Sequence, residues 1–266
     1  MTAVRPYLSL IQRAGASVGV SFREIEAGQI YSASYEDKQF AMYNVDLGLN
    51  DSSSFLIAKS KASTHSVLAS AGIPSVEHRF LLNPNSKYSS EDAFRKAERL
   101  FEQYGSDAVV KRDDGAQGEN VFRVTSLGEL RERLARLFSL ELNAAISPYR
   151  SSELEYRVVV LNDEVRLAFS KSRTSSWKHN LSGGASVGGI EPSLEDALFK
   201  LAADAANAVG LAFCSVDILN TSEGLQVLEV NGTVFLSEFI KGNAEREKRA
   251  FRLFQDAFRT KFRMRD

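Results

Sequence analysis

Residues 215–232, which read SVDILNTSEGLQVLEVNG, decide the fold. Apolar and polar residues alternate on both sides of a polar turn, which predicts two antiparallel strands at residues 213–219 and 225–230. Side chains two positions apart in a strand share one face of the sheet. Glu229 and Asn231 are therefore expected to point the same way, with the valine between them pointing into the core.

These strands carry three oxygen-bearing side chains, on Asp217, Glu229 and Asn231. Oxygen donors suit hard cations, and a site with few protein ligands that leaves positions for water and phosphate is typical of magnesium. The three side chains are thus a candidate metal site. The alternative is that Asp217 caps a turn and Glu229 is a solvated strand end.

A second candidate site is the hairpin predicted from residues 108–111 and 120–124. Lys111 ends its first strand, and the loop RDDGAQGEN follows. Gly115 and Gly118 in that loop can expose backbone N–H groups to phosphate oxygens. The chain has no GxxxxGK[ST] motif, which excludes a P-loop, and a hairpin of this kind can also be only a turn.

The remaining pattern predicts a mixed α+β chain built from antiparallel hairpins and helices. Helical apolar spacing, N-cap residues and terminal glycines mark the helices, and alternation marks the strands. Helices are expected at residues 7–14, 54–71, 93–104, 127–140, 194–209 and from 244 onward, with further strands at residues 18–25, 29–35, 156–161 and 165–170.

Composition narrows the class of protein. The 266 residues are 44% hydrophobic and 25% charged, which is typical of a packed globular chain. A net charge of -1 provides no overall field for nucleic acid or an anionic membrane, so neither is expected as a partner. One cysteine and three scattered histidines exclude an intrachain disulfide and a recognisable zinc site. No apolar run approaches about 18 residues, and we expect a soluble cytoplasmic protein.

Several motifs, taken together, resemble those of a known family. They are Lys61 in AKSKASTHSVLASAGIP, Lys111 in AVVKRDDGAQGENVFRV, Arg157 in LEYRVVVLNDEVRLAFS, the loop WKHNLSGGAS, Asp217 in SVDIL, and LEVNG. In this order and spacing the chain resembles the ATP-grasp ligases, and within them the RimK-like and glutathione-synthetase-like carboxylate–amine ligases. The resemblance covers residues 54–239.

The resemblance implies an ATP-grasp fold, in which two α+β subdomains of antiparallel sheet and helices clamp a nucleotide. Residues 1–53 would form a shortened N-terminal module. Residues 54–148 would form the subdomain with the Gly-rich lid hairpin, and residues 149–266 the C-terminal subdomain with the metal site.

The resemblance also implies a role for individual residues. Arg157, Lys111 and Asn180 would be catalytic, with Arg157 stabilising the transferred phosphoryl group. The family hinge departs from its usual Gln-Glu-Tyr, so that Ser147 and Pro148 lie at the adenine edge. The ATP-binding residues would be Lys61, Lys111, Gly115, Gly118, Ser147, Tyr149, Glu155, Lys178 and Asn180, and the metal ligands Asp217, Glu229 and Asn231.

The activity implied is an ATP- and Mg²⁺-dependent ligation, with Mn²⁺ as the alternative ion. A carboxylate is first phosphorylated to an acyl phosphate, and an amine then displaces the phosphate to form an amide or peptide bond. Amino acids or peptides would supply both groups. The alternatives are a small-molecule kinase on the same fold and a nucleotide-binding module without turnover.

Several other side chains have two interpretations each. Lys171 and Arg173 are candidates for gripping a substrate carboxylate, or solvated residues. His179 is a candidate base or an idle loop residue, and Trp177 packs its loop or stacks on a ligand. The basic, phenylalanine-striped helix from residue 244 is expected to dock on the rest of the chain or to form part of a homodimer contact.

Overall fold

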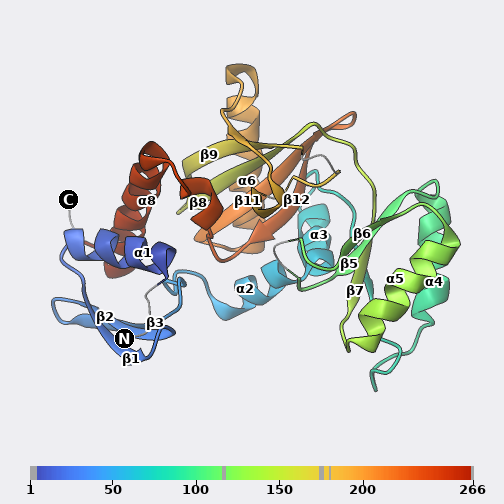
Figure 1. Ribbon diagram of the computed structural model, residues 1–266, viewed down its shortest axis with the longest axis horizontal. Coiled ribbons are helices and arrows are strands. Elements are labelled where there is room, and N and C mark those ends of the chain that lie inside the picture. Colours follow the sequence, from blue (N-terminus) through green and yellow to red (C-terminus); the bar gives the residue numbers. More distant parts are fainter. Residues whose placement is uncertain (1–4, 116–117, 174–176, 180, 265–266) are drawn as a thin grey trace.

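The computed structural model describes residues 5–115, 118–173, 177–179 and 181–264. It is the expected α+β protein with antiparallel sheets. A central sheet lies between an N-terminal module and a second sheet that carries two helices (Figure 1). In the described part of the chain, no helix has the length and apolar character needed to span a bilayer.

The central sheet has the strand order β10-β9-β8-β11-β12, with all neighbours antiparallel. One face packs on helix α6, and the core between them includes Val158, Val216 and Val230. Cys214 lies in the same core, where burial raises the pKa of its thiol to about 12. The elements are β8 (Leu154–Leu161), β9 (Glu164–Ser172), β10 (Val187–Gly188), α6 (Pro192–Val209), β11 (Phe213–Thr221) and β12 (Gly224–Asn231).

The second sheet has the order β4-β7-β5-β6. Helices α4 and α5 pack on one face of it, around Phe101 and Leu134, and the Asp92 side chain caps α4. Strand β7 was predicted only as a hinge segment, but it is a fully buried strand between β4 and β5. The elements are β4 (Arg79–Leu81), α4 (Ala93–Gln103), β5 (Ala108–Arg112), β6 (Val121–Val124), α5 (Leu127–Ser139) and β7 (Ala144–Pro148).

The C-terminal helix of the chain packs against the N-terminal module. Helix α8 packs beside α1, and its Phe254, Phe258 and Phe262 are buried in a core shared with the module (Figure 1). The phenylalanine stripe therefore faces the protein's own N-terminal residues, as expected for a docking helix. The elements are α1 (Pro6–Ser17), β1 (Ser21–Glu26), β2 (Ile30–Tyr35), β3 (Lys38–Tyr43), the short α7 (Ser237–Ile240) and α8 (Ala244–Phe262).

The single helix predicted for residues 54–71 is wrong. Two helices, α2 (Ser52–Lys59) and α3 (Lys61–Ser70), meet at Ser60, whose backbone is extended and whose side chain accepts a hydrogen bond from the Ser63 N–H. Serine competes for helical backbone groups in this way and starts the second helix. The break places the first turn of α3 against the β5–β6 hairpin, where the Ala62 N–H donates to Asp113.

Both helices pack against the central sheet and α6. The subdomain boundaries expected at residues 53 and 148 stay a prediction.

Candidate active site

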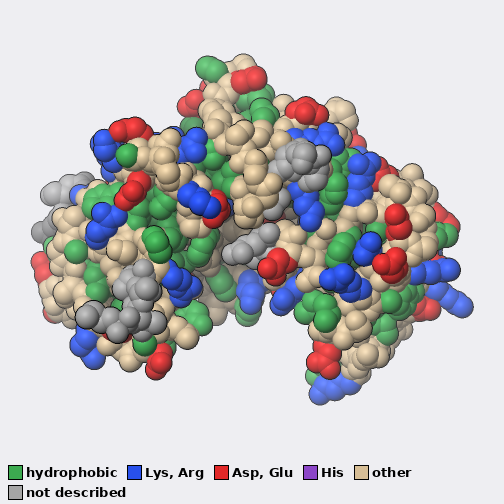
Figure 2. All heavy atoms as spheres, in the orientation of Figure 1, with side chains coloured by type: hydrophobic (Ala, Val, Ile, Leu, Met, Phe, Trp, Pro, Cys, Tyr) green, Lys and Arg blue, Asp and Glu red, His purple; other side chains and the backbone are tan. Residues whose placement is uncertain are grey.

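A cavity of about 570 Å³ lies between the central sheet and the β5–β6 hairpin. Figure 2 shows that the surface is hollowed between the part of the molecule that contains the N-terminal module and the part formed by the second sheet. The cavity size falls within the range of small-molecule sites, roughly 300–1,000 Å³. One wall comes from β8, β9, β11 and β12, and the other from α3, β5 and β7. The sheet face on this side carries the charged residues that line the cavity, and the opposite face is apolar and packs on α6.

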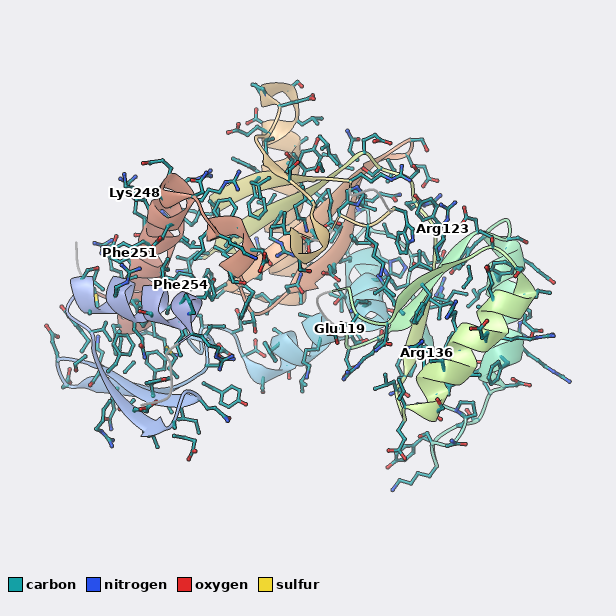
Figure 3. The ribbon with its side chains drawn as sticks, in the orientation of Figure 1. Glu119, Arg123, Arg136, Lys248, Phe251 and Phe254 are labelled. Atoms are coloured by element: carbon teal, nitrogen blue, oxygen red, sulfur yellow. The ribbon has the colours of Figure 1, made fainter. Side chains whose placement is uncertain are left out.

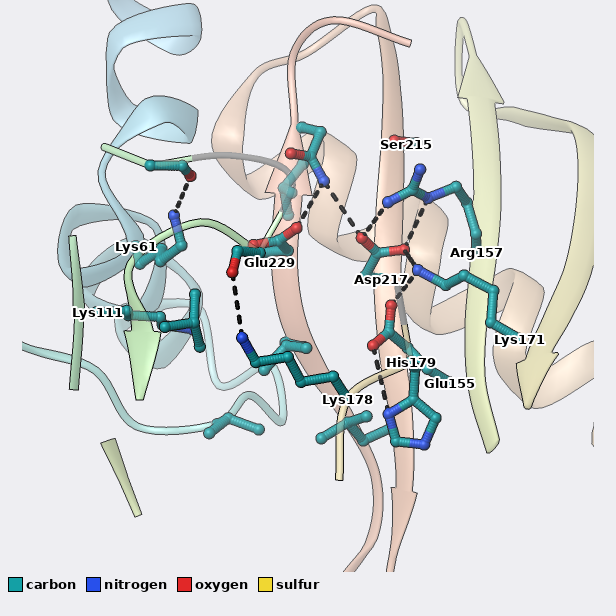
Figure 4. A pocket seen from close by; sticks show the side chains of 18 of the residues that line it. Lys61, Lys111, Glu155, Arg157, Lys171, Lys178, His179, Ser215, Asp217 and Glu229 are labelled. Carbon is teal, nitrogen blue, oxygen red and sulfur yellow. Dashed lines mark hydrogen bonds and ion pairs between the residues drawn. The ribbon is translucent and has the colours of Figure 1, made fainter. Parts of the chain in front are cut away.

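The cavity wall is organised by a row of residues that are direct neighbours across three strands. Asp217 on β11 pairs with Glu229 on β12 and with Arg157 on β8. The Arg157 guanidinium donates two hydrogen bonds to Asp217, from Nε to Oδ1 at 2.8 Å and from Nη2 to Oδ2 at 2.6 Å (Figure 4). This bidentate geometry fixes both side chains. Burial alone would raise the pKa of the Asp217 carboxyl, but the charges of Arg157 and Lys171 outweigh it and hold the pKa well below its usual range.

A second row carries a buried ion pair. Glu155 on β8 is the direct neighbour of Lys171 on β9, and the two side chains form an ion pair. Lys171 Nζ also donates to Asp217 Oδ1 at 3.0 Å, so one cation joins two carboxylates. Burial raises the pKa of the Glu155 carboxyl, while Lys171 opposes the shift. His179 lies next to this pair, with Nδ1 at 3.8 Å from Glu155 Oε2.

Asn231 connects the carboxylates of Asp217 and Glu229. Its Nδ2 donates to Glu229 Oε1 at 3.3 Å and to Asp217 Oδ2 at 3.4 Å. The three predicted ligands therefore lie together on one face, and Val230 is buried on the other. Among the described residues, no cluster of three or more His, Cys, Asp or Glu side chains suits a metal, and the predicted donor set consists of two carboxylates and an amide. Its oxygens fit a divalent hard cation, since rotation of the Asn231 amide turns its own oxygen toward the carboxylates.

Two buried lysines lie on the opposite wall. Lys61 Nζ donates to the carbonyl oxygens of Gly115 at 2.6 Å and Asp113 at 3.2 Å, which ties the hairpin loop to α3. Lys111 is 5% exposed, and burial together with the charge of Lys61 lowers its pKa to about 8. Two desolvated cations close together are costly unless an anion joins them.

The other predicted nucleotide contacts lie around the same cavity. Ser147 is buried near the end of β7, and Tyr149 follows, with the Arg123 guanidinium 3.6 Å from its ring centroid. Trp177 meets the Tyr149 ring edge-on at 5.8 Å and also lines the cavity. Lys178 Nζ donates to the Gly118 carbonyl oxygen at 3.3 Å.

The residues predicted as catalytic, ATP-binding or metal-binding that the structure describes all line this cavity. Asn180 lies outside the described residues. Arg173 does not line the cavity, and it pairs instead with Glu153 at 3.4 Å. The central place of Lys171 between two carboxylates was not anticipated, although the alternation of β9 puts it on the same face as Phe169. The roles of the predicted site residues stay predictions. The described residues on the cavity wall are Lys61, Lys111, Gly115, Gly118, Ser147, Tyr149, Glu155, Arg157, Lys178, Asp217, Glu229 and Asn231.

Solved structures define the class of fold. The D-alanine–D-alanine ligase of Bacillus anthracis, solved in complex with ATP, superposes with a TM-score of 0.60 at 16% identity, covering 80% of this chain and 70% of that one. A bifunctional glutathione synthetase from Pasteurella multocida gives a TM-score of 0.64 at 15% identity, covering 98% of this chain and 44% of that one. The fold is that of the ATP-grasp ligases.

The family follows from the sequence. Residues 58–247 match the model of the RimK-like ATP-grasp domain, and the chain belongs to this family. The tetrahydromethanopterin:alpha-L-glutamate ligase of Methanocaldococcus jannaschii is 34% identical over 134 residues, 48% of this chain and 45% of the relative. A probable alpha-L-glutamate ligase of Xanthomonas oryzae pv. oryzae is 29% identical over 189 residues, 69% of this chain and 60% of the relative. The chain thus matches about half of the length of these relatives.

Proposed function

We propose that this protein is an ATP- and Mg²⁺-dependent carboxylate–amine ligase that acts on amino acids or peptides. The observation that carries the proposal is the row of Glu229, Asp217 and Arg157 on one cavity wall, with the buried Lys61 and Lys111 on the other. Acids that suit a divalent ion and cations that suit phosphate lie on the two sides of a nucleotide-sized space. The family and the names of its relatives support the same activity.

The reaction proceeds in two displacements. A carboxylate oxygen of the substrate attacks the γ-phosphorus of ATP, and the bond to the β-phosphate oxygen breaks to release ADP. The amine nitrogen then attacks the carbonyl carbon of the acyl phosphate, inorganic phosphate leaves, and the nitrogen loses a proton. Both steps develop negative charge on phosphoryl oxygens, which fixed cations stabilise.

Each group on the wall has a task in this reaction. Lys61 and Lys111 would neutralise the phosphates of ATP, and Arg157 would stabilise the transferred phosphoryl group. Asp217, Glu229 and Asn231 would hold the divalent ion, which supplies further neutralisation of the phosphates when bound. The bond from Lys61 to Gly115 holds the start of the hairpin loop beside the cavity, where the loop would exclude water from the acyl phosphate.

The test is a coupled ADP-release assay with pairs of amino acids and short peptides, followed by the mass of the product. We expect ADP and inorganic phosphate only when a carboxylate and an amine are both present. Asp217→Asn and Glu229→Gln should each lower kcat by about a hundredfold or more, because each removes a charge that holds the cation. Asp204→Asn is the matched control, since this acid is exposed on α6 and pairs with Lys200.

Three results would contradict the proposal. Phosphate retained on a hydroxyl product would indicate a kinase. ATP binding without substrate-dependent ADP release would indicate a nucleotide-binding module. Full turnover in Asp217→Asn would remove the metal assignment. The expected cytoplasmic location, the absence of nucleic-acid and membrane partners and a homodimer contact stay predictions.

A further inference from the structure

Ring side chains gather at the end of the cavity that lies along β5 and β7 from Lys111. These strands are antiparallel, and Pro148 lies opposite Ala108, three residues or about 10 Å along β5 from Lys111. Pro148, Tyr149 and Trp177 all line the cavity there. This is also the end where the hinge of the family is expected. If Lys111 contacts the phosphates, as proposed, the base of the same nucleotide would lie beside these rings.

The Tyr149 ring is covered on one face by an arginine from the hairpin. Arg123 on β6 places its guanidinium carbon 3.6 Å from the centroid of the ring, a distance at which the planar group lies over the ring face. The same guanidinium donates two hydrogen bonds to Asp107, from Nε to Oδ1 at 2.8 Å and from Nη2 to Oδ2 at 2.6 Å, which fix its plane. The Tyr149 N–H donates to the Asp107 carbonyl oxygen at 3.1 Å. The three residues therefore hold one another in place.

A second aromatic ring packs on this unit from another loop. Trp177 meets the tyrosine ring edge-on, with the ring planes at 89° and the centroids 5.8 Å apart. Two further cations line the cavity at this end, and each has a different partner. Arg150 pairs with Glu223 at 2.7 Å, and Lys178 donates to the Gly118 carbonyl oxygen at 3.3 Å. The guanidinium on the tyrosine face is therefore a separate feature of this end of the cavity.

We propose that Arg123 is a positioning residue for the base of the nucleotide, because it holds the Tyr149 ring, and through it Trp177, at the end of the cavity that receives the base. The inference rests on the proposed ligase activity. Arg123 does not line the cavity, so it acts on the base through Tyr149. A ring that is already ordered loses little conformational freedom when a base packs against it. Without Arg123, ATP binding would have to order the ring, while phosphoryl transfer at the other end of the cavity would be unaffected.

The test measures binding of the β,γ-imido analogue of ATP with Mg²⁺ by calorimetry, together with the KM for ATP and kcat. Arg123→Gln should raise the Kd of the analogue and the KM for ATP about fivefold, with kcat within about twofold of wild type. The Arg123 side chain is 32% exposed, so the variant should fold. Arg136→Gln is the matched control, because the exposed Arg136 on α5 lies 5.7 Å from the Phe122 ring centroid and neither residue lines the cavity (Figure 3). It should change none of the three values.

A double variant separates the contact with Tyr149 from a general loss of structure. In a Tyr149→Leu background, Arg123→Gln should have no further effect on the Kd, because the guanidinium no longer has a ring to hold. An undiminished effect in that background would overturn the inference, and so would equal effects of Arg123→Gln and Arg136→Gln, or a fall in kcat at unchanged KM. Analogue binding without ADP release from ATP would refute the ligase activity, and the Kd ratios would still decide the role of Arg123. No binding to the wild-type protein would overturn both.

Discussion

Replacing Lys171 with methionine removes the cation that joins Glu155 to Asp217. Lys171 is 4% exposed, forms an ion pair with Glu155 and donates to Asp217 Oδ1 at 3.0 Å. Methionine fills a similar space, so the change is mainly one of charge. Asp217 keeps its bidentate bond to Arg157, whereas among the described residues the remaining ion-pair partner of Glu155 is the ring of His179 at 3.8 Å. Most of the loss in folding stability therefore comes from the charge of Glu155, which loses its main partner.

Breaking a buried ion pair on one side costs about 3–5 kcal/mol. We expect Lys171→Met to lower the free energy of unfolding by about 3 kcal/mol at about pH 8. Burial already raises the pKa of Glu155, and loss of Lys171 raises it further. The folded state then binds more protons than the unfolded chain, whose Glu pKa is about 4.3, so stability falls as pH rises between the two values. Part of the loss should return at about pH 5.5.

The assay is urea unfolding followed by circular dichroism at both pH values. Lys171→Met combined with Glu155→Gln should recover much of the stability at about pH 8, because no uncompensated charge remains on Glu155. Lys200→Met is the control; its pair with Asp204 is exposed and contributes about 0–1 kcal/mol. A loss in Lys171→Met that is independent of pH, or that Glu155→Gln does not relieve, would refute the ion-pair argument.

Three further predictions follow from single contacts. ATP affinity should weaken as pH rises above about 8, where Lys111 loses its proton, and Lys111→Arg should remove this dependence in calorimetric titrations; a flat wild-type profile would contradict it. Gly232→Ala should lower the free energy of unfolding by about 1–3 kcal/mol, because its Cβ would lie 2.8 Å from Phe55, and Phe55→Ala should relieve part of the loss. Asn50→Ala should cost about 2–3 kcal/mol in the same measurement, because Asn50 bonds the N–H and the carbonyl oxygen of Phe213; a neutral variant would refute this.

Exposed residues on the outer helices α5 and α8 lie away from the candidate active site. Figure 3 shows Lys248 and Phe251 on α8 and Arg136 on α5 at opposite ends of the molecule, away from the residues in Figure 4. Exposed pairs such as Lys248 with Glu245 contribute little to stability. The informative substitutions are therefore those on the cavity wall.

Sequence alone determined the class of fold and most of its elements. The spacing of two between Glu229 and Asn231 placed them on one face, and N-cap residues and terminal glycines marked helix ends such as those of α4 and α6. These features depend on a few neighbouring residues, which is why a local pattern predicts them. The motifs from Lys61 to LEVNG also identified the family, which the domain match confirms.

The tertiary structure alone decided which of these residues meet. Strand register, set by the packing of the whole central sheet, puts Arg157 beside Asp217 and Lys171 beside Glu155. Local alternation fixes the face of a side chain but not its neighbour on the next strand. In the same way, Phe235 reaches the cavity only because α1 and α8, distant in sequence, pack together and Tyr7 supports its ring. Contacts between distant segments depend on packing that no short stretch of sequence contains.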